Sequence, residues 1–161
     1  MVSAVNGRGL AISIFVCQAA LVNASAQAKK EPRLSAYQGC YRVAVSAWRG
    51  NAGLDPSVTT PPSPIELTGE QVEGFTKTKR YWVKPAREAK NKAFPLSFWH
   101  LTPQGEVTIT FTTGFEGLTM TLVPKGSSLI GTARASGDVN PDENFQIAGA
   151  RADRMECNDR K

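Results

Sequence analysis

The sequence predicts an all-β domain, and three observations support this prediction. After residue 28 helical periodicity is almost absent, and apolar and polar residues alternate along short runs instead. Short turns containing Gly separate the later runs, which is typical of antiparallel hairpins. Cys40 stands at the head of the first run and Cys157 at the tail of the last one. A disulfide between them would bring the first and last strands together, since bonded cysteines must lie close in space.

The strands are expected in two groups along the chain. The first run extends from Cys40 to Trp48, and a proline-rich loop over residues 49–64 follows it. Proline cannot donate a ladder hydrogen bond, so this loop should contain neither a central strand nor a helix interior. Two shorter β-prone runs cover residues 65–67 and 80–84. The alternation is stronger from residue 96 onward and predicts strands at 96–102, 107–112, 118–123, 129–135 and 146–157.

These runs amount to about eight strands, a number at which an antiparallel meander can close into a barrel, fully or in part. A β-sandwich is the alternative, but in its immunoglobulin form the two cysteines lie closer together in the sequence. The alternation also predicts which side chains fill the interior. The bulky residues should be buried, at Val107, Ile109, Phe111, Leu118, Met120 and Leu122, while Thr108, Thr110, Thr119 and Thr121 should face outward. Small residues of the last strands should lie opposite the bulky ones, at Gly131, Ala133, Ala135, Ala148, Ala150 and Ala152.

The first 28 residues have the pattern of a secretory signal peptide. Arg8 precedes an apolar stretch that is too short to span a bilayer, and small residues around Ala26 and Ala28 fit a cleavage site. We therefore expect a signal peptide at 1–28, a flexible segment at 29–38, and a single barrel domain at 39–161. The product should be periplasmic or extracellular, with no transmembrane segment. Cys17 lies inside the apolar stretch in a context that does not fit a lipobox, so two cysteines remain to form a disulfide.

The positive charge of the chain is concentrated in one segment. The formal net charge is +5, and residues 77–92 carry seven basic side chains against only Glu88. Tyr81 and Trp82 interrupt this basic run. An acidic partner or an anionic surface would suit such a segment, but a solvated strand edge that resists aggregation explains it more simply. No nucleic-acid partner is expected, and the protein is expected to be a monomer.

One family resemblance lies at the start of the first strand. Gly39-Cys40-Tyr41, opening a long strand in a small exported β-domain, resembles the lipocalin-like barrels, whose chains open with Gly-x-Trp. In that family the tryptophan packs against a basic residue near the last strand and closes the barrel. The resemblance implies that Tyr41 replaces the tryptophan and that Arg151 or Arg154 is the basic partner. It concerns architecture, as does a broader likeness to exported bacterial β-domains.

The sequence shows no catalytic or metal-binding constellation. Its only histidine, His100, lies in an apolar run, where a packed or rim histidine is more common than a catalyst. No cysteine and histidine cluster has metal-ligand spacing, and residues 138–144 lack the turn glycine and closing glutamate of a calcium loop. We expect no enzyme activity, no cofactor and no metal.

The aromatic residues of the first half remain as candidates for binding. Trp82, Phe98 and Trp99 are predicted to border the open end of the barrel, with Arg80 and Lys84 nearby as anchors for an anion. Because Phe98 and Trp99 are neighbours on one strand, only one of them can point inward. The leading hypothesis is a non-catalytic protein that binds a small apolar or amphipathic ligand inside the barrel. The alternative is a protein-binding inhibitor or assembly factor with a filled interior.

Overall fold

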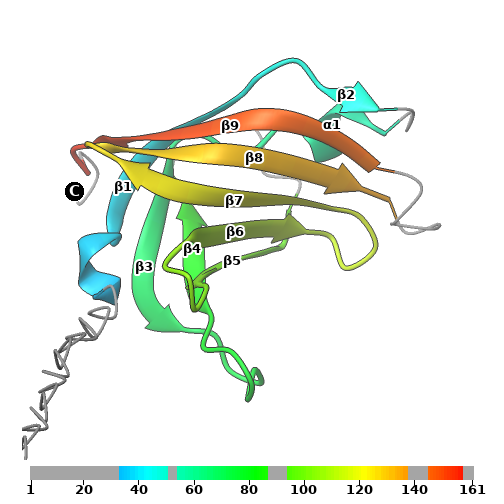
Figure 1. Ribbon diagram of the computed structural model, residues 1–161. Helices are drawn as coiled ribbons and strands as arrows, with labels where there is room; N and C mark the ends of the chain where they lie inside the picture. Colours follow the sequence, from blue (N-terminus) through cyan, green and yellow to red (C-terminus); the bar gives the residue numbers. More distant parts are fainter. Residues whose placement is uncertain (1–32, 51–53, 87–93, 138–144, 158–161) are drawn as a thin grey trace, which may run out of the picture. The chain divides into compact units, whose positions relative to one another are not determined.

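An antiparallel sheet of nine strands holds more than half of the residues that the computed structural model describes, which are 33–50, 54–86, 94–137 and 145–157 (Figure 1). The helical elements within these ranges are one 3-10 turn, η1 (Leu34–Ala36), and one α-helical turn, α1 (Pro56–Thr59). The predicted all-β class is therefore confirmed. The strands are β1 (Gly39–Val45), β2 (Arg49–Gly50), β3 (Ile65–Gln71), β4 (Tyr81–Pro85), β5 (Leu96–Leu101), β6 (Val107–Thr112), β7 (Gly117–Lys125), β8 (Ser128–Ser136) and β9 (Phe145–Met155).

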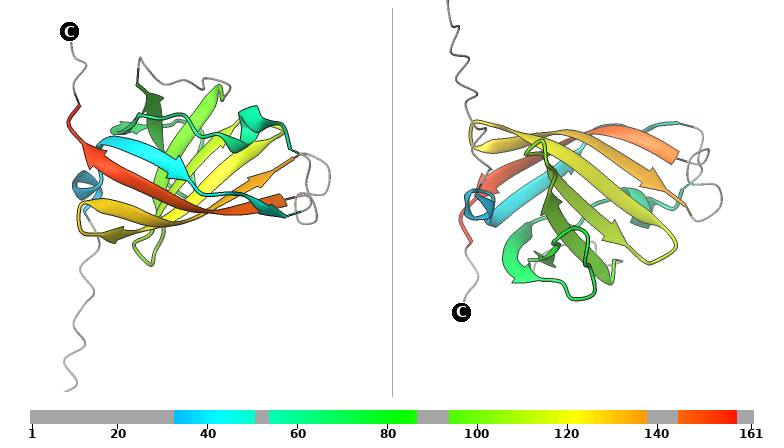
Figure 2. Two further views of the ribbon diagram at one scale, coloured as in Figure 1. Left: turned by 90° about the horizontal axis from the view of Figure 1, so that it is seen from above. Right: turned by 60° about the horizontal axis from the view of Figure 1, so that its bottom comes forward.

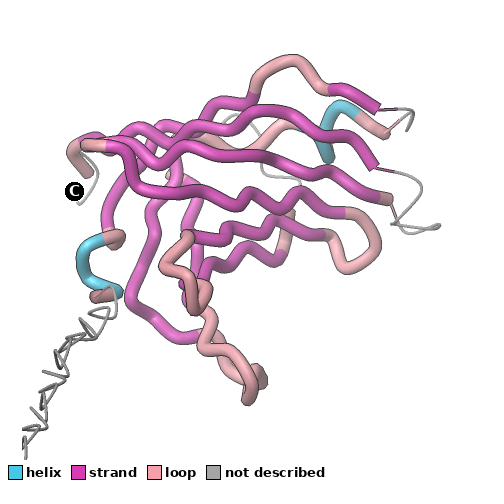
Figure 3. Tube along the Cα trace, in the orientation of Figure 1, coloured by secondary structure: helices cyan, strands magenta, loops and turns pink. Residues whose placement is uncertain are grey.

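Eight of these strands form a closed up-and-down barrel, as the sequence predicted. Each of β3 to β8 pairs antiparallel with the next strand along the chain, and β1 pairs with both β3 and β9. The views in Figures 1 and 2 show β1 beside β9, although the two strands come from opposite ends of the chain. The ninth strand, β2, adds to the far end of β9 through Arg49 opposite Ile147. The trace in Figure 3 shows these strands together with the loops and turns that connect them.

The predicted disulfide joins β1 to the segment that follows β9. Cys40 and Cys157 are bonded, with their Cα atoms 5.3 Å apart, inside the range that disulfides require. Cys40 also pairs with Met155 in the ladder that closes the barrel. The covalent bond therefore reinforces the seam at which the first and last strands meet.

Side chains fill the centre of the barrel. All six bulky residues that the alternation predicted to be buried have no accessible surface, which confirms the predicted register. Large and small residues meet across the β7–β8 ladder, where Leu118 faces Ala135 and Met120 faces Ala133. Small residues on one strand leave room for bulky ones on the next, so a narrow barrel can be packed without voids.

Gly131 shows how tight this packing is. It pairs with Leu122, and a Cβ atom at position 131 would collide with the carbonyl oxygen of Thr121. A side chain of any size at this position would push β7 and β8 apart. Glycine is required here by close approach of two backbones rather than by a turn.

The outward-facing threonines are less exposed than predicted. Thr108 is 9% exposed, and Thr110, Thr119 and Thr121 are half-buried. Thr108 lies on the outer face between His100 and Thr121 in the neighbouring strands, and Thr110 and Thr119 share a hydrogen bond of 3.4 Å between hydroxyls. Cross-strand neighbours on the same face cover one another, which binary alternation does not take into account.

The segments around β1 also differ from the sequence prediction. The first strand ends at Val45 rather than at Trp48, whose indole Nε1 donates to the Thr59 carbonyl at 3.1 Å. The proline-rich loop contains β2 and α1, and α1 begins because the Asp55 carboxylate accepts from the Ser57 amide at 2.7 Å. That bond lowers the pKa of Asp55 below its ordinary value.

Part of the segment expected to be flexible packs on the barrel. Within residues 33–38, Leu34 and Tyr37 contact the hydrophobic core. The predicted signal peptide at 1–28 and the oxygen-rich stretch at 138–144 lie outside the described residues. Among the residues that are described, no helix has the length and apolar character needed to cross a membrane.

The core predicts a large effect for one substitution. Phe111→Ala should lower the free energy of unfolding by about 3–5 kcal/mol, because it removes a fully buried ring and leaves a cavity. Denaturant titration of the purified protein measures this change. Phe115→Ala is the matched control, since Phe115 is 73% exposed and should change stability by less than about 0.5 kcal/mol. A loss below about 1 kcal/mol for Phe111→Ala would contradict the packing described.

The disulfide predicts a second effect on stability. It closes a loop of 117 residues, for which the chain-entropy model gives about 4–5 kcal/mol as an upper figure. The double variant Cys40→Ser/Cys157→Ser should therefore unfold at clearly lower denaturant concentration, and with a steeper dependence on denaturant because its unfolded chain is less compact. The oxidised and reduced wild-type proteins provide the control, and equal midpoints for the two would rule out this contribution.

Candidate functional site

Strands β4 and β5 carry most of the residues predicted to form a binding site. Tyr81 pairs with Trp99 and Trp82 pairs with Phe98, so each pair shares one face of the sheet. Trp99 belongs to the hydrophobic core, which fixes the first pair as inward-facing. Trp82 and Phe98 are therefore on the outer wall of the barrel. Phe98 and Trp99 point to opposite sides, as the strand periodicity required.

Trp99 is part of the packed interior rather than of a rim. Its side chain has no accessible surface, and its indole Nε1 donates to the Thr68 carbonyl at 2.9 Å. The Tyr81 ring lies 5.5 Å from it, at a tilt of 44°. These contacts satisfy the indole N–H and fix the ring, as is usual for a buried tryptophan. The structure therefore separates Trp99 from the other four predicted site residues.

An irregularity in β3 produces the loop that covers the outer wall. The register between β3 and β4 shifts between Leu67 and Gln71, and the Val72 amide donates to the Arg80 carbonyl beyond that shift. The chain between them leaves the sheet and brings Phe75 onto the outer face. Its ring centroid lies 5.7 Å from that of Phe98.

Arg80 lies against both of these rings. Its guanidinium carbon is 3.9 Å from the Phe75 centroid and 4.4 Å from the Phe98 centroid. Rings on opposite sides of the group would lie much further apart than the observed 5.7 Å, so the two rings cover neighbouring sides of it. A cation over two aromatic faces is attracted by both ring quadrupoles. Arg80 is thus held in place and keeps one side uncovered by rings.

Two nitrogens at this place are buried without a hydrogen-bond partner in the described part of the chain. They are Nε of Arg80 and Nδ1 of His100. The Oγ of Ser97 is also buried without a hydrogen-bond partner. Burial lowers the pKa of His100 below its usual value, and the charge of Arg80 lowers it further. The imidazole is therefore neutral at neutral pH, so Arg80 is the cation of this pair.

Lys84, the second predicted anchor for an anion, is engaged within the chain. Its Nζ donates to the Glu70 carboxylate at 2.6 Å, and this bond raises the pKa of Lys84. Both side chains of the pair are more than half exposed, so the pair contributes little to stability. Glu70 offsets the charge that Lys84 would offer to a ligand.

The structure thus brings together one cluster on the outer wall, which we call the arginine–aromatic patch. It consists of Phe75, Arg80, Trp82, Phe98 and His100. The sequence prediction included three of these residues in its binding site and missed Phe75 and His100. Phe75 carries a signal of its own, since it is the one large apolar side chain in the otherwise polar turn at residues 73–79.

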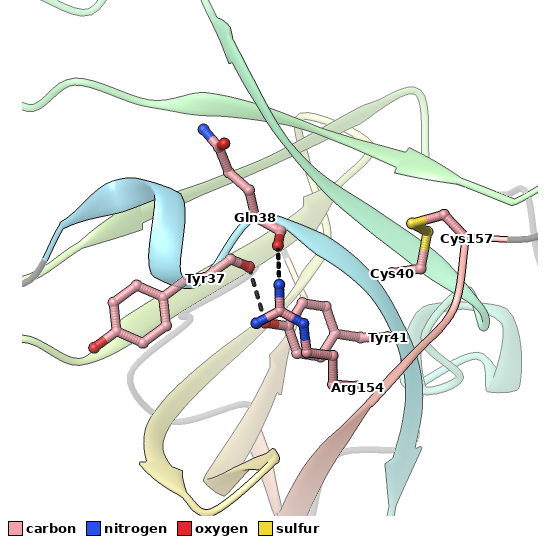
Figure 4. Close-up of a disulfide and its surroundings, with 6 residues drawn as sticks. All are labelled: Tyr37, Gln38, Cys40, Tyr41, Arg154 and Cys157. Carbon is pink, nitrogen blue, oxygen red and sulfur yellow. Dashed lines mark hydrogen bonds between the residues drawn. A yellow bond between two sulfur atoms is a disulfide. The ribbon is translucent and has the colours of Figure 1, made fainter.

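The residues predicted to close the barrel lie beside the disulfide (Figure 4), at the same end of the barrel as the β3–β4 loop. Arg154 pairs with Tyr41 across the closing ladder and donates to the carbonyls of Ala36 and Gln38, at 3.1 and 2.8 Å. Arg151 instead binds Asp153 at 2.7 Å on the outer face, and hydrogen bonds from Ser128 and Arg151 lower the pKa of Asp153. Of the two arginines, Arg154 is therefore the one beside Tyr41.

This end of the barrel has a shallow pocket, and polar groups that line it form hydrogen bonds within the chain. The pocket has a volume of about 230 Å³ and is lined by Tyr37, Tyr41, Leu129 and Arg154 among others. The Tyr41 hydroxyl donates to the Tyr37 carbonyl at 2.9 Å, and burial raises its pKa. Since its polar groups bind each other, this end favours a structural role.

A second depression lies on the outer wall at the β6–β7 turn. Its volume is about 250 Å³, and threonines 110, 112 and 119 line it beside Phe115. The Thr112 and Thr113 hydroxyls both donate to the Glu116 carbonyl, at 2.9 and 3.3 Å. The hydroxyls therefore stabilise the turn itself.

The described residues contain no group of three or more His, Cys, Asp and Glu side chains that could hold a metal ion. A cluster of His100 with two carboxylates would have favoured an enzyme, and in this part of the chain none is found. The charged group that acts on His100 is Arg80 instead.

Comparison with known proteins adds no relative to this description. The chain matches no protein-family model, no curated protein and no solved structure.

The environment of His100 predicts a pH dependence of stability. Its pKa in the folded state lies below the ordinary 6.5, so the unfolded chain binds the proton more readily between these two values. Stability should therefore fall as the pH falls below about 6.5. The single histidine gives one imidazole NMR signal, whose titration measures the pKa directly. Arg80→Met should raise this pKa, and a signal titrating at or above 6.5 in the folded wild type would contradict the burial described.

Proposed function

We propose that this chain is an exported, non-catalytic binding protein that recognises a partner protein with the outer wall of its barrel. A small ligand held inside the barrel, the leading hypothesis from the sequence, has less support. The observation that carries the proposal is the packing of the interior. Ligand sites in proteins are concave and need free volume, and the barrel centre is occupied by the chain's own side chains.

On six of the eight barrel strands, inward-facing side chains are fully covered. Trp99, Ile109, Phe111, Met120 and Leu122 have no surface that a water-sized sphere can touch, from outside or from a cavity. Side chains on β3, β8 and β9 are equally covered, namely Ile65, Ala133, Ala135 and Ala152. A ligand among these residues would have to displace several of them, which is costly in a close-packed core.

The outer wall offers the residue types that dominate protein interfaces. Arginine and the large aromatics carry a disproportionate share of binding energy in such contacts. The arginine–aromatic patch combines an arginine, a tryptophan and two phenylalanines, and Phe75 is 37% exposed. Protein partners bind gently curved surfaces of this kind, whereas small molecules prefer pockets.

Two further observations support export. The Cys40–Cys157 disulfide is typical of proteins that fold in an oxidising compartment. The first 28 residues have the composition of a cleaved signal.

A photo-crosslinking experiment tests the proposed partner. A photoreactive amino acid replaces Trp82 in the full-length chain, produced in its own cells, and covalent adducts are analysed by mass spectrometry. We expect a protein adduct from position 82 and none from Thr132, an exposed outer-face position on β8. Lipid adducts, or equal protein adducts from both positions, would contradict the proposal.

A fatty-acid titration tests the competing hypothesis. Hexadecanoic acid added to the full-length protein should cause no saturable change in tryptophan fluorescence, because the filled interior has no room for the chain of the acid. The variant Trp99→Ala opens space in the core and serves as a positive control for uptake of apolar probes. Saturable binding of one fatty acid by the wild type would restore the hypothesis of an internal ligand.

A further inference from the structure

We propose that the arginine–aromatic patch receives a carboxylate from an acidic, partly apolar segment of the partner protein, with Arg80 as the receiving group. This inference rests on the proposed function and specifies the chemistry of the partner. It follows from the geometry of Arg80, its burial, the charge around it and the apolar surface beside it.

The position of the guanidinium prepares it for an anion. Phe75 and Phe98 hold it from two neighbouring sides, at 3.9 and 4.4 Å, so little freedom is left to lose on binding. The planar fork of an arginine matches a carboxylate through two parallel hydrogen bonds. None of the carboxylates described in the structure forms an ion pair with Arg80 within 4.0 Å.

Burial makes an added anion favourable. The Nε of Arg80 has lost its contact with water and has no partner among the described residues. The two rings further reduce the hydration of the cation. A poorly hydrated cation gains more from a nearby negative charge than an exposed one does, because the effective dielectric constant is lower.

The charges near the patch select an acidic partner. Residues 70–86 carry Lys77, Lys79, Arg80 and Lys84 against Glu70 and Glu73. Glu70 and Lys84 bind each other and cancel, so the positive excess near the patch is that of Lys77, Lys79 and Arg80 over Glu73. The field at the patch is therefore positive, which attracts and orients a negative segment.

The apolar surface beside Arg80 distinguishes a protein segment from other anions. Phe75 is 37% exposed, and Trp82 is half-buried on the same face. An aromatic or aliphatic side chain next to the carboxylate would cover this surface. A bare phosphate would leave it in water.

A second arginine on the outer wall provides a matched control. Arg134 on β8 lies over one ring only, that of Phe145, at 4.3 Å, and has a further partner within the chain. It has the same charge and a similar aromatic contact. If charge alone mattered, replacing Arg134 would weaken binding as much as replacing Arg80.

The three tryptophans make the experiment specific. Trp82 lies in the patch, Trp99 in the core and Trp48 beside the loop at Thr59, and each gives one indole N–H signal in a ¹⁵N NMR spectrum. The full-length protein is titrated with a capped peptide that alternates Glu with Phe and Leu. We expect the Trp82 indole and the Arg80 Nε–H signals to shift, while the signals of Trp99 and Trp48 stay in place.

Arg80→Met should weaken binding at least about tenfold, the size expected for a charged hydrogen-bonded pair. Arg134→Met should leave it unchanged, and an unmoved Trp99 signal shows that both variants remain folded.

Each other outcome overturns the inference in an identifiable way. A peptide with Gln in place of Glu that binds equally well would show an apolar contact without a carboxylate. Equal losses for Arg80→Met and Arg134→Met, or tighter binding of a single-stranded oligonucleotide, would show general attraction of anions. Absence of any Trp82 shift at millimolar peptide would exclude the patch as a site for such segments. A shift of Trp99 alone would refute the proposed function as well, because it would place the ligand inside the barrel.

Discussion

The pairing of β1 with β9 is the constraint on which the rest of the fold depends. Without it the strands would form an open sheet with two unpaired edges, and the apolar face would lie in water. The ladder from Cys40–Met155 to Val45–Ala150 closes the barrel. The disulfide and the bonds from Arg154 to the η1 segment reinforce one end of this seam. Closure divides the side chains of every barrel strand into an inner set that packs together and an outer set that a partner can contact.

The inner set could be predicted from the sequence because strand periodicity and residue size agree there. Val107, Ile109 and Phe111 alternate with threonines, and small residues on β8 face the bulky ones on β7. Tyr41 and Arg154 meet because both lie on the inner face at the ends of their strands. Arg151 is three residues from Arg154 along the strand, so it lies on the opposite face. Once the register is known, the periodicity alone therefore shows that Arg154, and not Arg151, lies beside Tyr41.

The outer set could be predicted only in part, since nothing in a period of two says which outward side chains will meet. Arg80, Trp82 and Lys84 share a face as expected, but Lys84 is bound by Glu70 from the neighbouring strand. Phe75 reaches the patch because β3 and β4 lose register between Leu67 and Gln71, and no local pattern marks that shift. The burial of Thr108 has the same origin, in neighbours that come from other strands.

The patch also lies where the barrel wall has the fewest backbone pairings. Between β4 and β5 the ladder is confined to Tyr81–Trp99 and Trp82–Phe98, whereas β7 and β8 pair along their whole length. Side chains take over part of the connection: Trp99 reaches Thr68 on β3 from the inside, and Arg80 joins Phe75 to Phe98 on the outside. A carboxylate bound to Arg80 would therefore act on a contact that also holds this seam together. A ligand bound to Arg80 would raise the free energy of unfolding, because it would bind only the folded state. If the patch binds a partner as proposed, this binding and the β4–β5 ladder would be coupled through Arg80.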